Sequence, residues 1–314
     1  MKKVTVIIPN YNGKKYIDKC LKALENQKYK DFDVVVVDNG SEDGSDRVGN
    51  KYKLNLNVIQ FEENKGFAAA VNAGIESVDT PFVILLNNDA YATPNFVENL
   101  VNAIEWERDV FSAQGLMLQD EHKDLVDSAG DYFCSLGWAF SKGKDKSLGK
   151  YMFQKNVFSA CAGAAIYNRD ILQQIGMFDE KFFAYIEDVD VGYRAKLVGF
   201  KNIVVPEAMV FHVGSGSSGE RHNSFKVTLG ARNTMLMMHK NFAWWQWIIN
   251  GPAIGLGILI KIIYFSRKKL RREYLDGISQ YRRMKKDMPK FWGGNTRIRW
   301  RIQWELWINC FKRL

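Results

Sequence analysis

The sequence predicts an α/β protein with a mostly parallel central sheet flanked by helices, followed by a helical C-terminal extension. Three observations support this prediction. Strand and helix patterns alternate over the first 110 residues, which is typical of βαβ units. Polar side chains follow several expected strands, and after about residue 240 the chain becomes basic and rich in tryptophan. With 314 residues, the chain can form one large domain and an appendage.

The first 110 residues are interpreted as four strands, each followed by a helix. Helical spacing is clearest from Ile17 to Leu24, and four consecutive valines at 34–37 indicate a strand buried on both faces. Thr93 and Pro94 are expected to open the fourth helix as its N-cap and first residue. We expect strands at 4–9, 33–38, 57–62 and 81–87, and helices at 16–27, 41–52, 66–77 and 93–106.

The next 130 or so residues are less regular. From about residue 110 to 155, short strands and polar turns are expected. Residues 157–172 then give a strand that leads into a helix, 185–199 a helix that opens with acidic residues, and 201–215 one or two short strands. The Gly/Ser-rich stretch 212–224 is expected to be mobile.

Cysteine content and charge limit the function classes. Four cysteines lie far apart without a CxxC pair, which argues against a zinc ribbon and favours a reducing compartment. The apolar run Val4 to Ile8 is too short for the core of a signal peptide, so we expect a protein that is not secreted. Residues 267–314 hold 15 Lys and Arg against 4 Asp and Glu, which accounts for the net charge of +9. This asymmetry indicates a polyanionic partner for the tail, either nucleic acid or an anionic membrane.

Three expected strands end in polar clusters: residues 9–13, 38–41 and 87–89. Parallel strands bring their carboxyl ends to one edge of a sheet, which is where open α/β sheets bind ligands. Taken alone, the second cluster is better explained as a turn with a helix cap, and the third as a polar loop. Their expected coincidence at one edge favours a binding site.

Six segments occur in order along the chain: VIIPNYNG, VVVVDNGSEDGS, NKGFAAAVNAG, LLNNDA, the stretch from CAGAAIYNRDIL to IGMFDEKFFAYIEDVDVGYRAKLVG, and VFHVGS. This order resembles glycosyltransferase family 2, most of all its bacterial rhamnosyltransferase-like branch. The resemblance implies a GT-A fold, a nucleotide-sugar donor, Mn²⁺ or Mg²⁺, and inversion of the anomeric centre by a single displacement. It also implies a catalytic domain at 1–240, with a nucleotide-binding half at 1–110 and an acceptor-binding half at 111–240.

The expected donor site lies in the first half. Tyr11 offers a ring for stacking on the base, and Asp38 can accept from a base N–H or a ribose hydroxyl; by resemblance both are base-contacting positions. Gly66 opens a helix whose free N–H groups suit anions, whereas Lys65 beside it can equally be a solvated side chain. Arg232 and Asn233 are expected to close over the diphosphate. The expected donor-binding residues are Pro9, Tyr11, Asn12, Asp38, Gly40, Lys65, Gly66, Asn72, Asn87, Asn88, Asp89 and Arg232.

A divalent metal site is expected at Asp89 and His212. Asp89 matches the last acid of the family's Asp-x-Asp element, and Asn87 stands at its first position, so only one carboxylate is present there. Mg²⁺ often uses one or two protein ligands together with substrate phosphates. His212 matches a histidine that completes the metal site in some relatives, and a structural histidine is the alternative.

Glu187 and Asp188 are the expected catalytic pair. An acceptor hydroxyl must lose its proton as it attacks the sugar, and a carboxylate is the usual base. The resemblance places the base at Asp188, with Glu187 holding the acceptor or the base. The alternative is that these acids only complement a helix N-terminus. Cys161 and Gly163 are expected to leave room for the acceptor, or else to allow tight core packing.

The tail, residues 241–314, is expected to form a basic, Trp-rich helical region that associates with a membrane. Residues 241–260 carry no charge, and basic residues follow. One crossing would separate this basic flank from the catalytic domain, so we expect an in-plane or re-entrant helix pair, broken near Gly251 and Pro252. A buried helix packed on the catalytic domain is the alternative. The aromatic residues run with aliphatic ones, which argues against nucleic acid.

Together these features predict an inverting, metal-dependent glycosyltransferase at the cytoplasmic face of the cell membrane, attached peripherally. The expected donor is dTDP-rhamnose or a UDP-hexose, and the acceptor a lipid-linked or cell-surface glycan. A homodimer through the C-terminal region is a further expectation. The rival hypothesis is a noncatalytic, membrane-bound scaffold that binds nucleotide-sugars. A nucleotidyltransferase is disfavoured because no Gly-rich, basic phosphate loop follows the first strand.

Overall fold

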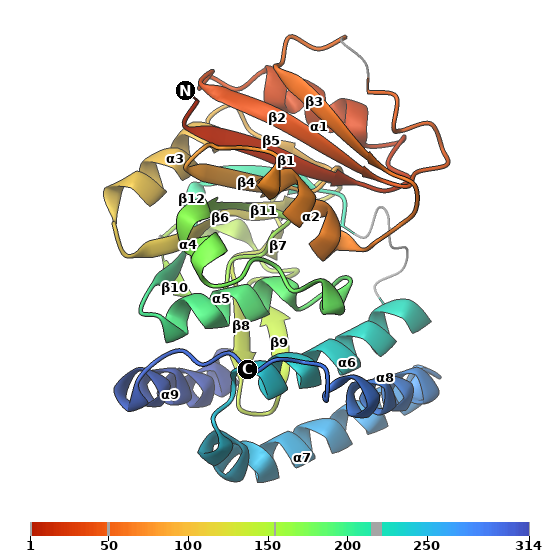
Figure 1. The fold of residues 1–314 in the computed structure, drawn as a ribbon, viewed down its shortest axis with the longest axis vertical. Coiled ribbons are helices and arrows are strands. Elements are labelled where there is room, and N and C mark those ends of the chain that lie inside the picture. The colour runs from red at the N-terminus through yellow and green to blue at the C-terminus, as the bar shows by residue number, and fades with distance from the viewer. Residues whose placement is uncertain (1, 49–50, 154, 215–221, 314) are drawn as a thin grey trace.

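The computed structural model describes residues 2–48, 51–153, 155–214 and 222–313. Within these residues, ten strands form one mixed sheet with helices on both faces (Figure 1). A two-stranded ribbon and the C-terminal helices lie beyond one side of this sheet, toward the bottom of Figure 1. The predicted α/β class, with its helical C-terminal extension, is confirmed.

The elements are as follows. The large sheet contains β1 (Val4–Asn10), β2 (Phe32–Asn39), β3 (Leu56–Phe61), β4 (Phe82–Leu86), β5 (Ala90–Ala92), β6 (Val110–Gln119), β7 (Val126–Ser128), β10 (Lys155–Val157), β11 (Ala164–Asn168) and β12 (Lys201–His212). The ribbon contains β8 (Asp131–Cys134) and β9 (Trp138–Ser141). The helices are α1 (Ile17–Glu25), α2 (Phe67–Glu76), α3 (Phe96–Trp106), α4 (Arg169–Gln174), α5 (Glu187–Leu197), α6 (Ser224–Asn241), α7 (Trp244–Arg267), α8 (Arg271–Met284) and α9 (Thr296–Arg313).

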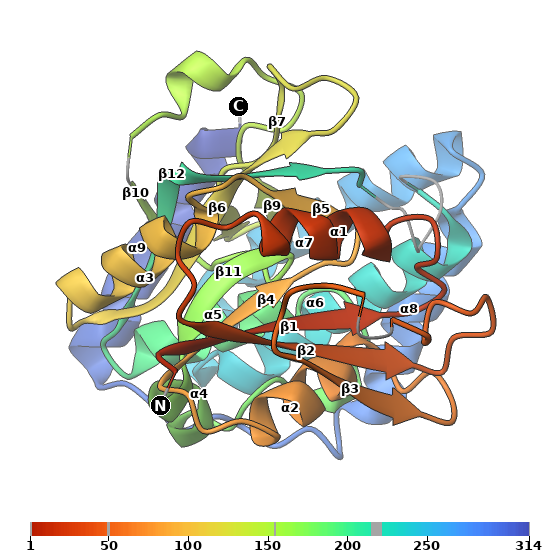
Figure 2. The same ribbon diagram turned by 90° about the horizontal axis from the view of Figure 1, so that it is seen from above.

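The sheet order is β10-β12-β6-β11-β4-β1-β2-β3, with β5 paired to β12 and β7 to β6. β3, β2, β1 and β4 run parallel, whereas β11 runs antiparallel between β4 and β6 (Figure 2). Asn10 is in register with Asp38 across β1 and β2. The carboxyl ends of β1, β2 and β4 therefore meet at one edge of the sheet, as we expected from the polar clusters that follow these strands.

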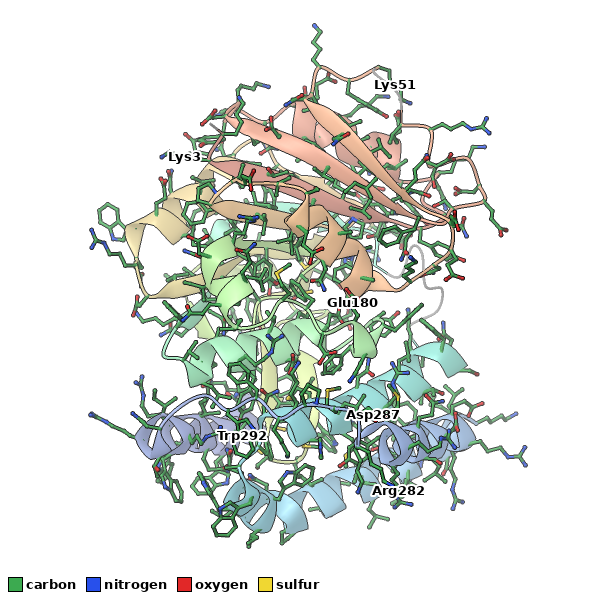
Figure 3. The ribbon with its side chains drawn as sticks, viewed as in Figure 1. Lys3, Lys51, Glu180, Arg282, Asp287 and Trp292 are labelled. Carbon is green, nitrogen blue, oxygen red and sulfur yellow. The ribbon has the colours of Figure 1, made fainter. Side chains whose placement is uncertain are left out.

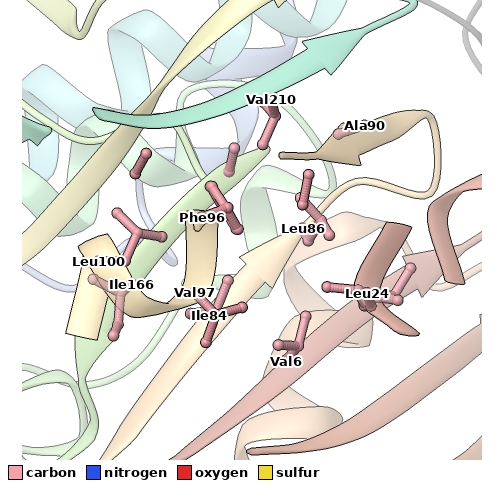
Figure 4. Packing of buried hydrophobic residues seen from close by; sticks show 14 of the residues in the cluster. Val6, Leu24, Ile84, Leu86, Ala90, Phe96, Val97, Leu100, Ile166 and Val210 are labelled. Carbon is pink, nitrogen blue, oxygen red and sulfur yellow. The ribbon is translucent and has the colours of Figure 1, made fainter. Parts of the chain in front are cut away.

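The strands alternate between two cores with a period of two. In β4, Ile84 and Leu86 face one cluster, which also contains Leu24 of α1 and Phe96 of α3 (Figure 4). Val83 and Leu85 face the other cluster, which contains residues of α2, α4 and α5. The sheet is thus covered on both faces, which explains why its strands read as continuous apolar runs.

The helix expected at 41–52 is wrong, because the described part of this segment forms bends and turns. Gly44 has a φ of +80°, a left-handed conformation that interrupts a helix. Ser45 Oγ accepts from the Gly13 N–H at 3.1 Å, and Asp43 accepts from the Lys14 N–H at 2.9 Å. These side chains bind the loop after β1, and such contacts compete with helix formation.

Other expected boundaries also move. α3 begins at Phe96 instead of Pro94, because the Thr93 hydroxyl donates to the Met209 backbone oxygen at 2.9 Å and does not cap the helix. The first strand after residue 110, β6, has 10 residues, and the region after residue 200 is one strand of 12 residues with a register shift before Met209. Of the stretch expected to be mobile, residues 215–221 lie outside the described residues.

α7 is one unbroken helix of 24 residues that passes through Pro252, so the expected break near Gly251 and Pro252 is wrong. Pro252 lies on the exposed side. A single stripe packs against the rest of the protein: Gln246, Asn250, Ile254 and Gly257. The opposite side is apolar and exposed, so α7 is not the fully buried helix of the alternative reading. By length and composition alone, α7 could cross a membrane.

The C-terminal helices share a hydrophobic core with the preceding chain. Val189 and Tyr193 of α5 belong to the same buried cluster as Leu236 of α6 and Ile302 and Leu306 of α9. Figure 1 shows α5 lying between the large sheet and these lower helices. The residues after 240 therefore pack on the helix that carries the expected catalytic pair.

Candidate active site

Asn10 joins the ends of three parallel strands through its side-chain amide. Its Nδ2 donates to Asp38 Oδ1 at 2.8 Å, and its Oδ1 accepts from Asn88 Nδ2 at 2.8 Å. Asp38 Oδ2 accepts from the Ser41 N–H at 2.9 Å. Asn10, Asp38 and Asn88 are all buried. The three polar clusters predicted from the sequence thus form one network at the edge of the sheet.

The rim beside this network has an unusual backbone and an open aromatic ring. Gly40 has a φ of +75°, and a Cβ there would lie 2.6 Å from the Glu63 backbone, so only glycine fits. Asn12 has a φ of 49°. Pro9 is half-buried in β1, and the side chain of Tyr11 is exposed. The Tyr11 ring is therefore accessible to a stacking partner.

Asp89, His212 and Asp127 form a buried charged triad. His212 Nε2 lies 3.2 Å from Asp89 Oδ1, and His212 Nδ1 lies 2.8 Å from Asp127 Oδ2. Burial lowers the pKa of His212, but hydrogen bonds to Asp127 and Asp89 outweigh burial and raise this pKa to about 9. Burial raises the pKa of Asp127, but the contacts with His212 and Lys144 outweigh it and lower this pKa to about 2. The imidazole is thus held between two carboxylates.

The segment 161–163 lies directly beside the end of β4. The Asn87 N–H donates to the Gly163 backbone oxygen at 2.9 Å, and a Cβ on Gly163 would lie 3.0 Å from Asn87 Nδ2. The Cys161 N–H donates to Gln114 Oε1 at 2.8 Å. The small residue at 163 is therefore explained by the close approach of Asn87, and an acceptor-binding role for Cys161 and Gly163 stays a prediction.

The backbone that leads into α5 is strained. Phe183, Tyr185 and Ile186 have φ values of 64°, 69° and 73°, a region that residues other than glycine rarely occupy. Asn233 of α6 holds this segment. Its Nδ2 lies 2.8 Å from each of the backbone oxygens of Phe182, Ala184 and Tyr185. Strain of this kind persists only where surrounding contacts fix it, and it is common at functional sites.

Asp188 follows this segment in the first turn of α5. Its Oδ2 accepts from the Ala162 N–H at 3.3 Å, and its Oδ1 accepts from the Val189 N–H at 2.8 Å. Glu187 is buried, and among the described residues its Oε2 has no hydrogen-bond partner. Burial raises the pKa of both carboxyl groups, and the charge of Asp188 adds to the shift at Glu187.

A third carboxyl group, Asp131 of β8, completes this cluster. Ligand-type atoms of Asp131, Cys161 and Asp188 all lie within 4.8 Å of one another. Burial, and then the charge of Asp188, raises the pKa of Asp131 to about 7. Burial likewise raises the pKa of the Cys161 thiol well above its usual range. Because the Gly163 backbone binds Asn87, this cluster and the Asp89 triad lie on adjoining segments of one site.

Residues 5–176 match the family model described as Glycosyl transferase family 2. The matched region is more than half of the chain and contains the strands that carry the polar network and Asp89. The chain belongs to glycosyltransferase family 2. The resemblance inferred from the six ordered segments is thereby confirmed.

Two curated relatives show how this glycosyltransferase compares with named enzymes. It is 24% identical to the N-acetylglucosaminyl-diphospho-decaprenol L-rhamnosyltransferase of Mycobacterium tuberculosis over 300 residues, which cover 85% of this chain and 95% of the relative. It is 34% identical to the Teichoic acid poly(glycerol phosphate) polymerase of Staphylococcus epidermidis over 110 residues. That second match covers 32% of this chain and only 15% of the polymerase.

The solved structures agree on the fold. A mannosyltransferase from Pyrobaculum calidifontis, solved in complex with GDP-Man and Mn²⁺, has a TM-score of 0.58 and 15% sequence identity. The likeness covers 89% of this chain and 87% of the mannosyltransferase. It shows that the glycosyltransferase has the predicted GT-A fold.

The helix N-terminus at Gly66 differs from the expectation. Gly66 has a φ of +92° before α2, and the Ala68 N–H donates to the Phe183 backbone oxygen at 3.2 Å. One of the N–H groups expected to be free for an anion is therefore bound within the protein. The Lys65 Nζ lies 5.1 Å from the centroid of the Phe61 ring, and the side chain is exposed. Donor binding by these two residues stays a prediction.

Asn72 and Arg232 make structural contacts in this glycosyltransferase. Asn72 Nδ2 donates to the Phe178 backbone oxygen at 2.8 Å, and Asn72 Oδ1 accepts from the Phe178 N–H at 3.1 Å. Arg232 Nη2 donates to the Phe182 backbone oxygen at 2.8 Å, and burial lowers the Arg232 pKa. Both side chains hold the segment that leads to Asp188. Their predicted roles toward the donor gain no support from these contacts.

Two groups of side chains could hold a divalent cation, and their chemistry separates them. His212 Nε2 faces Asp89, while its Nδ1 is fixed by Asp127, which is the arrangement by which proteins orient a metal-binding histidine. The Asp131, Cys161 and Asp188 group is geometrically compact, but one of its three ligand atoms is a cysteine sulfur, a soft ligand that does not suit Mn²⁺ or Mg²⁺. The Asp89 and His212 pair therefore fits Mn²⁺ or Mg²⁺ better.

Sequence reasoning missed the residues that organise the site from outside the motifs. Asp127 and Asp131 lie in an otherwise apolar and small-residue stretch, VDSAGDYF, and this interruption was the only available signal. Asn10 stood inside a recognised motif, but its bridging position needed the sheet order. Asn233 was expected at the diphosphate together with Arg232, but its contact with a segment about 50 residues away was missed, because nothing in the local sequence indicates it.

Proposed function

We propose that this enzyme is an inverting glycosyltransferase that moves a sugar from a nucleotide-sugar donor to a hydroxyl of a lipid-linked or cell-surface glycan. Asp188 is the general base, and the nucleoside diphosphate is the leaving group. One observation supports this proposal above the others. The Asp188 carboxyl group lies beside segment 161–163, which binds the carboxyl end of β4 where Asp89 stands.

The reaction follows from these positions. The acceptor hydroxyl gives its proton to a carboxylate oxygen of Asp188 while the hydroxyl oxygen attacks the anomeric carbon of the donor sugar. The bond between that carbon and the diphosphate oxygen breaks, and the bonding electron pair leaves with the diphosphate. One displacement from the opposite face inverts the anomeric centre, so no covalent intermediate on a second carboxylate is required. Glu187 lies beside the base and helps to hold the acceptor.

The donor is held at the edge formed by β1, β2 and β4. Tyr11 supplies an exposed ring for the base, and the rim at Asp38 and Gly40 lies next to it. When bound at Asp89 and His212, Mn²⁺ or Mg²⁺ would neutralise charge on the diphosphate. The relative from M. tuberculosis is named as an L-rhamnosyltransferase, which favours dTDP-rhamnose over a UDP-hexose. Its name also includes a diphospho-decaprenol acceptor, which supports a lipid-linked acceptor here.

The C-terminal helices are proposed to hold the enzyme on the cytoplasmic face of the membrane. The exposed apolar side of α7 includes Leu256, Leu259 and Ile263, which are 53%, 53% and 50% exposed. Five exposed basic residues follow within six positions: Arg267, Lys268, Lys269, Arg271 and Arg272. Apolar and basic surfaces in this order suit an anionic lipid surface. Figure 3 shows Asp287 and Trp292 on the segment that joins α8 to α9. The homodimer stays a prediction.

The base assignment is tested with Asp188→Asn. The purified enzyme is incubated with Mn²⁺, a lipid-diphosphate-linked sugar, and dTDP-rhamnose or one of several UDP-hexoses, and released nucleoside diphosphate and glycosylated product are measured. Loss of a general base should lower transfer by about 10²–10⁴-fold, because the acceptor keeps its proton. Donor binding measured by calorimetry should change little.

The matched control is Asp124→Asn, the same substitution at an exposed carboxylate. It should transfer at the wild-type rate. Full transfer by Asp188→Asn would overturn the assigned base. A wild-type protein that binds a donor but neither transfers nor hydrolyses its sugar would overturn the proposed function and favour a noncatalytic scaffold.

A further inference from the structure

The unassigned carboxyl group nearest to the proposed base is Asp131. It is 8% exposed and lies at the first position of β8. Its side-chain oxygen, the Asp188 oxygen and the Cys161 sulfur all lie within 4.8 Å of one another. Two carboxyl groups at this separation in a buried place do not ionise independently.

Both carboxyl groups are fixed on rigid parts of the fold. Ser141 Oγ donates to Asp131 Oδ1 at 2.5 Å, across the β8–β9 ribbon. The Asp131 N–H donates to the Ser159 backbone oxygen at 3.1 Å, which ties β8 to the strand segment before Cys161. Asp188 is fixed by the Ala162 N–H and by its own helix. The separation of the two carboxyl groups is therefore set by backbone contacts on both sides.

The surroundings of the pair are acidic. The ionisable groups whose charges act on Asp131 are Asp188 and Asp127, and Asp131 in turn acts on Cys161, Tyr167 and Glu187. Burial and the charge of Asp188 raise the pKa of Asp131 to about 7, while the Ser141 hydroxyl lowers it. Among the residues that the structure describes, no lysine or arginine is a cause of the pKa shift at Asp131. A proton added to the pair is thus stabilised by the negative charge that remains.

We propose that Asp131 is a positioning residue for catalysis, forming with Asp188 a carboxyl pair that takes up the acceptor proton as a unit. This inference rests on the proposed function. A solvated aspartate binds protons weakly at neutral pH, because its ordinary pKa is about 3.9. The ionised Asp131 carboxylate makes Asp188 a stronger base. After the proton moves from the acceptor oxygen to Asp188, the negative charge that remains on Asp131 stabilises the protonated Asp188 carboxyl group.

The test is the pH dependence of transfer in Asp131→Asn and Ser141→Ala. Asp131→Asn removes the neighbouring charge, so the acidic limb of the kcat profile should move to lower pH by about 1 unit, with a plateau roughly 10-fold lower. Ser141→Ala removes a hydrogen bond that favours ionised Asp131, so the acidic limb of the kcat profile of this variant should move to higher pH. Shifts of opposite sign are not expected from two substitutions that merely loosen the fold. Thermal unfolding of both variants checks that they are folded.

A second measurement does not depend on transfer. Carboxyl ¹³C resonances titrated in the donor-free protein should show Asp188 losing its proton at lower pH in Asp131→Asn than in the wild type. An unchanged pH profile in Asp131→Asn, with Asp188→Asn still inactive, would overturn the carboxyl pair and leave the proposed function standing. Loss of Mn²⁺ binding in Asp131→Asn but not in Asp89→Asn would also overturn the carboxyl pair, because Asp131, Cys161 and Asp188 would then form a metal site.

Discussion

Asp190 lies two residues after the proposed base, yet its environment is the opposite of that of Asp188. Its Oδ2 accepts from Arg194 Nε at 2.8 Å and from Lys240 Nζ at 3.2 Å, and its Oδ1 accepts from Asn241 Nδ2 at 2.7 Å. Burial alone would raise the Asp190 pKa, but the charges of Arg194 and Lys240 outweigh burial and lower it. Two acids on one helix thus have pKa values shifted in opposite directions, upward for Asp188 and downward for Asp190.

This difference predicts how the protein responds to acid. The folded-state pKa of Asp190 is depressed, so its stabilising contribution is complete above its unfolded pKa of about 3.9 and is lost as pH falls through the folded value. Asp190→Asn should lower the free energy of unfolding at pH 7 by about 3–5 kcal/mol, because it leaves Arg194 and Lys240 buried without their counter-charge.

Urea denaturation at pH 7 and at successively lower pH measures this effect. The difference between the wild type and Asp190→Asn should narrow as the medium becomes more acidic than about pH 4. The matched control is Asp79→Asn, whose partner Arg169 is 3.7 Å away and whose side chain is 91% exposed. It should change stability by less than about 0.5 kcal/mol. A constant difference at all pH values would contradict the assignment of a depressed pKa.

At the scale of single elements, α7 shows how tertiary contacts override a local helix breaker. Pro252 lacks the N–H that would bond the carbonyl four residues earlier. The buried stripe nevertheless holds both halves of the helix. Before the proline, Asn250 Nδ2 and Gln246 Nε2 donate to Gln303 Oε1 of α9 at 2.9 and 3.2 Å. After it, the Gly257 backbone oxygen accepts from Trp138 Nε1 at 3.2 Å. Trp245 stacks on Trp300 of α9 at a centroid distance of 4.6 Å. These contacts hold α7 in one direction on both sides of Pro252.

If α7 is continuous, Pro252→Ala should stabilise the enzyme. The substitution restores a backbone hydrogen bond on an exposed side of the helix, and the gain should be roughly 1–2 kcal/mol after the entropy cost in the unfolded chain. Thermal and denaturant unfolding in mild detergent measure this change.

Gly255→Ala is the control, because a Cβ there meets nothing within 4 Å. It should stabilise by about 0.5–1 kcal/mol through helix propensity alone. A loss of stability in Pro252→Ala would mean that the chain needs the break which the sequence suggested.

At the scale of the whole molecule, the proposed catalytic site and the proposed membrane-binding helix are joined by one hydrophobic core. α5 carries the proposed base on one end and packs on α6 and α9 through the shared cluster. Helix α7 lies on the far side of α6 from the large sheet (Figure 1). An enzyme attached to a membrane through α7 would therefore hold its C-terminal helices, which pack on α5, nearest to the lipid.

The proposed membrane-binding side of α7 is tested by a triple variant in which serine replaces Leu256, Leu259 and Ile263. These residues are about half exposed, so the protein should stay folded while co-sedimentation with vesicles of anionic and neutral lipid falls several-fold. Vesicles of neutral lipid alone should bind the wild type more weakly, because the basic residues after α7 lose their partner. Trp106→Ser, at an 88% exposed position on α3, should bind as the wild type does. Unchanged binding by the triple variant would exclude this surface as the contact.

The sequence by itself determined the α/β class, the family and the positions of most elements. Apolar periodicity and turn residues act over short distances, and six ordered segments carried the family resemblance. Asp188, Asp89 and His212 could be named for the same reason, since each lies within a local motif.

Only the tertiary structure decided which of these groups work together. Several features depend on residues that are far apart in the chain: the bends and turns at 41–48, the continuous α7, the structural contacts of Asn72 and Arg232, and the pairing of Asp131 with Asp188. The pKa of a carboxyl group depends on its burial and on the charges near it, and neither is visible in a local pattern. Asp188 and Asp190 have the same side chain on the same helix, and only their neighbours make one a candidate base and the other a buried counter-ion.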